Sequence, residues 1–302
     1  MRVIFFGTLC TFSAAPLRIL IEAGYEIGAV IIFTDQSITN QPIVPLSPTN
    51  QLSIPLLDTA SVPSIVSLAW QRQLPIYQVT RLAAPETLET LIALQPDVAC
   101  VACFPRRLPG AILHVPRHGC LNVHPSLLPH YRGPYPLFWM LRNGEQKCGV
   151  TVHFMDELLD TGDIAAQAEV ELPDGISGEE ADTLLSEYGG ECLVEVLDTI
   201  DKGSLARRPQ PAGGSYYSVP RDQDFVIDPA WSARRAFNFM RGTSEWGQLY
   251  PIELGEQRLM LKQALFYAAD ETLDRSYRLF GEQIDIQFSP GVLRALIAGE
   301  SL

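Results

Sequence analysis

The first third of the chain alternates short apolar strands with helices, and this order restricts the fold more than any other feature. Residues 2–6 and 27–33 are predicted as buried strands, and the apolar stripe within 13–23 predicts a helix that ends before Gly24. A strand, a helix and a second strand in this order are typical of a parallel sheet with helical crossovers. The alternation continues with strands predicted at 76–79, 97–103, 121–123, 149–154 and 164–172, and helices at 84–94, 136–141 and 177–201. We therefore predict an α/β fold with a Rossmann-like, mostly parallel sheet.

The composition changes beyond this region and predicts a second domain. Residues 206–218 are rich in Pro and Gly, which is typical of a linker. The last part, 219–302, has a short predicted helix at 231–240 and strand-like runs at 258–266, 276–279 and 283–288. We expect a catalytic domain over 1–205, the linker over 206–218, and a small β-rich, OB-like domain over 219–302.

One segment of the first domain departs from the alternation. Residues 35–71 contain five prolines and no Lys or Arg, and we predict a long loop there with a short helix at 63–70.

Charge and hydropathy exclude several classes of protein. The net charge of −13 argues against a nucleic-acid partner, because phosphate neutralisation provides most of the affinity of such complexes. No apolar run reaches the ~20 residues of a membrane span. The apolar N-terminal run stops at Gly7-Thr8, which favours a buried strand over a leader, so we expect a cytoplasmic protein.

The sequence contains no complete motif for a dinucleotide cofactor or a metal ion. Only Gly7 follows the first strand, so the G-x-G-x-x-G fingerprint of NAD or FAD binding is missing and we predict no NAD. Cys100 and Cys103 form a lone C-x-x-C within the predicted strand 97–103. We expect both to be small core residues rather than a metal or redox site, and we predict no metal.

Three polar side chains stand out as a candidate reaction centre. Asn122 and His124 are two residues apart on a predicted strand, so their side chains point to the same face. Asp160 lies in the turn Asp160-Thr161-Gly162-Asp163. An amide, an imidazole and a carboxylate suit acyl transfer without a nucleophilic side chain. Each has an ordinary alternative, a structural hydrogen bond at a strand end or a turn cap. We expect the other histidines to be surface or structural residues: His114, His118, His130 and His153.

The spacing of these motifs resembles the folate-dependent formyltransferase superfamily, and most closely the methionyl-tRNA formyltransferases. The similar stretches keep one register: 108–124, 126–129, Arg132-Gly133, 149–151 and 159–163. The resemblance implies a catalytic set of Asn122, His124 and Asp160. It also implies transfer of a formyl group from 10-formyltetrahydrofolate, as co-substrate, to an amine.

The chemistry of that reaction gives each side chain a role. An amine that attacks the formyl carbon produces an oxyanion and an ammonium, and one preorganised donor to the oxyanion is worth ~3–4 kcal/mol. We expect the Asn122 amide and a protonated His124 to be the donors. Asp160 is expected to keep the imidazole charged and to help move the proton.

The resemblance also implies where folate binds, namely the backbone of 104–108 and of 155–159. Arg106 and Arg107 either meet the anionic glutamate tail of folate or are solvated. The residues predicted to contact the folate are Phe104, Pro105, Leu108, Ser126, Leu127, Leu128, Pro129, Met155, Asp156 and Leu159.

The acceptor stays open at this point. The overall resemblance favours methionyl-tRNA. From Val219 onward, however, nine Lys/Arg stand against twelve Asp/Glu, which favours a small or carrier-bound amine such as an amino sugar nucleotide. An inactive folate-binding protein and a hydrolase that releases formate are the two alternatives of another kind.

Overall fold

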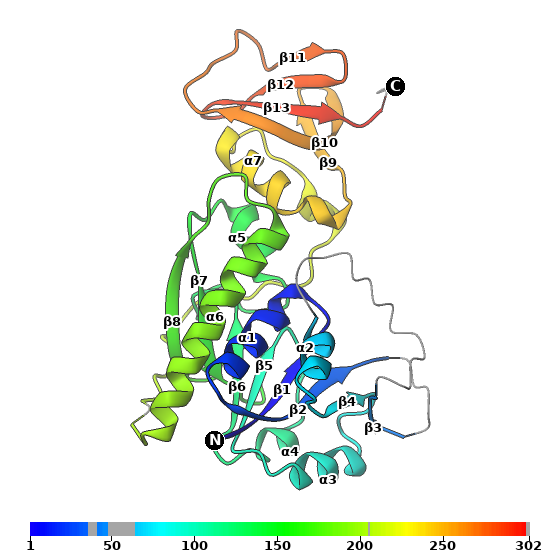
Figure 1. The fold of residues 1–302 in the computed structure, drawn as a ribbon. Helices are drawn as coiled ribbons and strands as arrows, with labels where there is room; N and C mark the ends of the chain where they lie inside the picture. The colour runs from blue at the N-terminus through cyan, green and yellow to red at the C-terminus, as the bar shows by residue number, and fades with distance from the viewer. Residues whose placement is uncertain (36–40, 48–63, 205, 300–302) are drawn as a thin grey trace. The chain divides into compact units, whose positions relative to one another are not determined.

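In the computed structural model of the protein, the apolar run at the start of the chain forms β1 (Arg2–Gly7), which lies between β2 and β5 in an eight-stranded sheet (Figure 1). The strand order is β3-β4-β2-β1-β5-β6-β7-β8. The pairs β1–β2, β2–β4, β1–β5 and β5–β6 are parallel, while β3–β4 and β6–β7 are antiparallel. The predicted mostly parallel α/β sheet is therefore confirmed. Its other strands are β2 (Glu26–Phe33), β3 (Ile43–Pro45), β4 (Ile76–Val79), β5 (Val98–Ala102), β6 (Cys120–His124), β7 (Lys147–Phe154) and β8 (Ile164–Glu171).

The structure describes residues 1–35, 41–47, 64–204 and 206–299. The chain divides into two units that each combine separate stretches. The first contains Met1–Arg132, Gly149–Val170 and Asp182–Ser215, and the second contains Gly133–Cys148, Glu171–Ala181 and Tyr216–Leu302. The division into a catalytic domain that ends at 205 and a C-terminal domain that begins at 219 remains a prediction.

Helices cover the sheet because their apolar faces meet the alternating side chains of the strands. Ile4 and Phe6 of β1 belong to a buried cluster with Leu91 and Ile112, which α3 and α4 supply. By contrast, α1 contacts β5 and α2, and α2 contacts β2. The helices are α1 (Thr11–Glu22), α2 (Ile65–Gln71), α3 (Pro85–Ala93), α4 (Gly110–Leu113), α5 (Pro136–Asn143) and α6 (Gly178–Asp201).

Helix α6 begins with the reciprocal hydrogen bonds of a capping box, since the Ser177 hydroxyl accepts from the Glu180 N–H and the Glu180 carboxylate accepts from the Ser177 N–H. It continues through Gly189 and Gly190 without a break. A Cβ at Gly189 would lie 2.4 Å from Val123 of β6, and one at Gly190 would lie 2.5 Å from Ile19 of α1. The two glycines therefore allow close packing of the helix.

The second unit contains a five-stranded antiparallel sheet in the order β11-β12-β13-β10-β9 (Figure 1). The predicted small β-rich domain is thus confirmed. Aromatic rings of Phe138, Phe225, Phe239 and Tyr250 pack against one another in this unit. Its elements beyond α5 are η1 (Asp222–Phe225), α7 (Ala233–Gly242), η2 (Ser244–Trp246), β9 (Tyr250–Leu254), β10 (Gln257–Ala268), β11 (Tyr277–Phe280), β12 (Gln283–Gln287) and β13 (Val292–Ile297).

Three details differ from the sequence-based expectations. The predicted loop over 35–71 contains β3, which pairs with β4, and residues 36–40 and 48–63 of that loop lie outside the described residues. The strand predicted to end at Cys103 ends at Ala102, and Cys103 is exposed rather than in the core. Its φ of +53° turns the chain out of the strand direction, which explains the exposure. In the part of the chain that the structure describes, no helix has the length and apolar character needed to span a membrane.

Candidate functional site

The pairing of β6 with β7 brings Asn122 opposite His153. The Asn122 amide nitrogen lies 3.1 Å from His153 Nε2, and His153 Nδ1 lies 2.9 Å from the Phe154 carbonyl. Because a carbonyl only accepts, Nδ1 carries the proton, and Nε2 of the neutral ring accepts from Asn122. This bond orients the Asn122 amide and leaves its second N–H for another acceptor.

His124 lies on the same face of β6 and is almost fully buried. Its Nε2 donates to the Tyr131 carbonyl at 2.9 Å, so in the neutral imidazole Nδ1 has no proton. Nδ1 is 3.8 Å from Asp160 Oδ1. Burial lowers the pKa of His124 below its ordinary value, and the attraction of Asp160 opposes this effect without cancelling it.

Asp160 lies between the two imidazoles, with Oδ1 also 3.7 Å from His153 Nε2. The residue is 7% exposed and has a φ of +55°, a left-handed conformation that costs a residue other than glycine ~1 kcal/mol. The structure thus brings together the three side chains that the sequence analysis named. It adds His153, which the sequence predicted to be a surface or structural residue.

Two further side chains hold the turn that carries Asp160. The Gln210 amide donates to the carbonyls of Asp160 and Gly162 at 2.8 and 2.9 Å. Arg132 donates to the Asp160 carbonyl through Nε at 3.1 Å and to Gln210 Oε1 through Nη2 at 2.6 Å. We call Arg132 and Gln210 the clamp of the Asp160 turn. The sequence analysis placed Gln210 in a linker and missed this function.

A hollow of about 560 Å³ adjoins β6 and the end of β7 within the first unit. Two of the predicted folate contacts, Met155 and Asp156, line it, together with Leu113, Cys120 and Phe154. The guanidinium of Arg207 stacks on the Phe154 ring, 3.6 Å from its centroid. The hollow has the size of a small-molecule site, typically ~300–1,000 Å³.

The remaining predicted contacts fall into two groups. In the first, Phe104 packs edge-on against Phe6, Pro105 and Leu159 are exposed, and Leu108 is buried in the core. In the second, Ser126 to Pro129 form a tight loop whose polar groups bond within the protein: the Ser126 hydroxyl donates to the His130 carbonyl, and Thr151 binds Ser126 and Leu128. All of these stay predictions as folate contacts. Arg106 pairs with Asp35 and stacks on Phe33.

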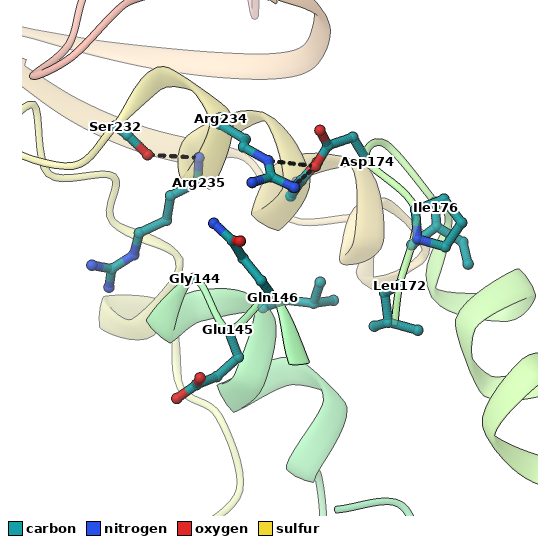
Figure 2. A pocket seen from close by; sticks show the side chains of 12 residues that line it. Gly144, Glu145, Gln146, Leu172, Asp174, Ile176, Ser232, Arg234 and Arg235 are labelled. Carbon is teal, nitrogen blue, oxygen red and sulfur yellow. Dashed lines mark hydrogen bonds and ion pairs between the residues drawn. The ribbon is translucent and has the colours of Figure 1, made fainter. Parts of the chain in front are cut away.

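A second, smaller hollow lies within the second unit, lined by residues of α5, α7 and the loop after β8 (Figure 2). Several of its polar groups bond to one another or to the backbone: Asp174 accepts from Arg234 and Asn238, both at 2.7 Å, and Arg235 Nε donates to the Arg142 carbonyl. Hydrogen bonds from Asn238, Tyr267 and Arg234 outweigh the effect of burial and lower the pKa of Asp174. This arrangement stabilises the loop rather than presenting an unpaired charge to a ligand.

Known proteins share both the sequence and the fold. The formyl transferase family matches residues 2–197. Methionyl-tRNA formyltransferase from Thermodesulfovibrio yellowstonii is 35% identical over 260 residues, which cover 86% of this chain and 79% of that protein.

Solved structures show the same fold at low identity. The N-formyltransferase from Helicobacter canadensis, in complex with folinic acid and dTDP-3-aminofucose, aligns with a TM-score of 0.67 and 16% identity over 98% of this chain and 99% of that one. A variant of HypX from Aquifex aeolicus aligns with a TM-score of 0.60 and 17% identity over 98% of this chain, which spans only 45% of that longer protein. By its match over residues 2–197 and its identity to the relative above, the chain belongs to the formyl transferase family.

Proposed function

We propose that the chain transfers a formyl group from 10-formyltetrahydrofolate to a primary amine at the centre formed by Asn122, His124 and Asp160. The observation that carries this proposal is the convergence of the three side chains. Asp160 lies 3.8 Å from His124 and 3.7 Å from His153, which binds the Asn122 amide. The amide, imidazole and carboxylate come from β6 and a turn that are far apart in the sequence.

Asn122 stabilises the negative charge that develops on the formyl oxygen. Its amide is already oriented by His153, so the second N–H needs no reorganisation during the reaction. Preorganised donors of this kind are worth ~3–4 kcal/mol each in a site from which water is excluded.

His124 takes the proton that the attacking amine loses. Because burial lowers its pKa, the imidazole is neutral before the reaction, and its unprotonated Nδ1 faces Asp160. Proton uptake at Nδ1 then creates a cation next to the Asp160 carboxylate, where attraction is strong. The C–N bond to the folate breaks as the imidazolium gives this proton to the leaving folate nitrogen, which restores the neutral imidazole. This order differs from the expectation that His124 is charged from the start.

The hollow beside β6 has room for the bicyclic head of folate. Its lining combines apolar side chains such as Leu113 and Met155 with charged ones such as Arg117 and Glu157, and it lies next to the strands that carry Asn122 and His153. Bound there, 10-formyltetrahydrofolate supplies the activated formyl carbon. Met155 and the start of the Asp160 loop orient it.

Methionyl-tRNA is the first candidate acceptor, and the 35% identity to a methionyl-tRNA formyltransferase over 86% of the chain supports it. A small or carrier-bound amine, such as an amino sugar nucleotide, is the second candidate. The charge balance favours it, since residues 219–302 hold nine Lys/Arg against twelve Asp/Glu.

The test measures tetrahydrofolate release from 10-formyltetrahydrofolate with charged initiator methionyl-tRNA, with a dTDP-linked amino sugar, and with no acceptor. Asp160→Asn is the inactive variant, and Asp201→Asn, at the exposed end of α6, is the control for removal of a carboxylate. We expect acceptor-dependent turnover that Asp160→Asn abolishes and Asp201→Asn retains.

Two outcomes would contradict the proposal. Tetrahydrofolate release at the same rate without any acceptor, with formate as the second product, indicates a hydrolase. Folate binding without turnover on either acceptor indicates an inactive folate-binding protein.

A further inference from the structure

Cys10 and Cys103 lie at the carboxyl ends of the neighbouring parallel strands β1 and β5. Cys10 immediately precedes α1, and Cys103 is the first residue after β5. Ser13 connects the two segments, because its hydroxyl donates to the Ala102 carbonyl at 2.7 Å and lies 3.5 Å from Cys10 Sγ. The left-handed backbone at Cys103 turns this residue out of the strand and leaves it exposed.

The two cysteines share one polar cluster at these strand ends. The Thr8 hydroxyl donates a hydrogen bond to Cys10 Sγ at 3.0 Å, the Ser13 hydroxyl lies 3.5 Å from the same sulfur, and the side chain of Cys103 interacts with that of Cys10. The bond from Cys103, with those from Ser13 and Thr8, outweighs burial and lowers the pKa of Cys10, while the same contact raises the pKa of Cys103. A thiol of lowered pKa beside a second thiol is the arrangement of reactive dithiols.

The other four cysteines are buried, unlike this pair, and none has the lowered pKa of Cys10. Burial raises the pKa of each thiol, which makes them poor nucleophiles: Cys100, Cys120, Cys148 and Cys192.

We propose that Cys10 and Cys103 form a reactive dithiol site that low-molecular-weight disulfides oxidise to an intrachain disulfide, with Cys10 as the attacking sulfur and Cys103 as the resolving one. Cys103 follows Ala102, which pairs with Val123 of β6. The exchange chemistry uses none of the side chains of Asn122, His124 and Asp160, so its test does not depend on the proposed function.

The reaction balances in two exchange steps. The Cys10 thiolate attacks one sulfur of glutathione disulfide, forms a mixed disulfide and releases one glutathione thiolate. Cys103 then loses its proton to that thiolate, and its sulfur attacks Cys10 Sγ and expels the second glutathione. Two cysteine thiols are oxidised, and one disulfide is reduced to two thiols.

The test incubates the reduced, folded full-length chain with glutathione disulfide and follows the intact mass, the free-thiol content and the cysteine-containing peptides. We expect the loss of two thiols, no retained glutathione, and a peptide that links Cys10 to Cys103. In Cys103→Ser, whose hydroxyl still donates to Cys10, we expect a stable glutathione adduct on Cys10. In Cys10→Ser, Cys103 should react at least tenfold more slowly. Cys148→Ser, which removes a buried thiol, is the control and should form the same disulfide as the wild type.

Three results would overturn the inference. One is a wild-type chain that keeps all its thiols under conditions that oxidise a small dithiol. Another is a disulfide that joins different cysteines. The third is equal reactivity of Cys10 in Cys103→Ser and of Cys103 in Cys10→Ser.

Discussion

Replacing Gln210 with Leu removes one half of the clamp of the Asp160 turn at nearly constant volume. The wild-type side chain donates to the Asp160 and Gly162 carbonyls and accepts from the Arg132 guanidinium at 2.6 Å. Neutral hydrogen bonds contribute ~1 kcal/mol each and a charge-assisted one ~2 kcal/mol. Both clamp residues are half-buried, so water replaces part of this loss. We expect the free energy of unfolding to fall by about 2–3 kcal/mol.

The same change should affect the reaction more than substrate binding. Asp160 keeps its left-handed backbone at a cost of ~1 kcal/mol, and without Gln210 the turn can relax and move the carboxylate away from His124. We expect kcat to fall at least ~10-fold, which corresponds to about 1.4 kcal/mol of lost transition-state stabilisation, with little change in KM for the folate.

The assay combines urea unfolding with steady-state kinetics at a temperature well below the thermal midpoint, so that unfolded protein does not reduce the rate. Gln71→Leu, at the exposed end of α2, is the matched control and should change neither quantity. A Gln210→Leu variant with the wild-type urea midpoint and the wild-type kcat would refute the prediction that Gln210 holds the Asp160 turn in place.

Three other perturbations follow from the same geometry. The lowered pKa of His124 means that the unfolded chain binds more protons there, so the free energy of unfolding falls as the pH drops below about 6.5. In pH-dependent urea titrations, the stability advantage of the wild type over His124→Gln should shrink across that window; parallel curves would contradict this. Thr151→Val deprives the buried Leu128 N–H of its acceptor and should cost about 2–4 kcal/mol in urea unfolding. Gly162→Ala places a Cβ 1.8 Å from the Phe154 carbonyl oxygen and should lower the thermal midpoint and kcat together; a wild-type midpoint would show that the turn adapts.

Most of the fold could be predicted because hydrophobic periodicity acts locally. Strand β4 has the predicted bounds, and α3 and α5 agree with their predicted ranges within two residues. β3 was missed because its three residues lie in a segment rich in Pro and polar residues. Gly189 and Gly190 interrupt the apolar stripe of the predicted helix 177–201, and only the tertiary packing shows why glycine suits both positions.

Only some residues of the candidate site could be identified from the sequence. Asn122 and His124 could be placed on one face because the period of a strand is two. The pairing of Asn122 with His153 depends on the β6–β7 register, which no local pattern reveals. Gln210 was missed for a similar reason, since its partners are backbone carbonyls about fifty residues away. The catalytic roles themselves stay a prediction.

The two glycines of α6 determine how closely this helix packs against its neighbours. Val123, the residue that Gly189 approaches, lies between Asn122 and His124, and Gly190 approaches α1, the helix that follows Cys10. A methyl group at Gly189 would therefore push against β6 and displace the side chains of Asn122 and His124 together. The missing side chains at 189 and 190 set how closely α6 approaches β6 and α1, and through β6 they position the proposed catalytic residues.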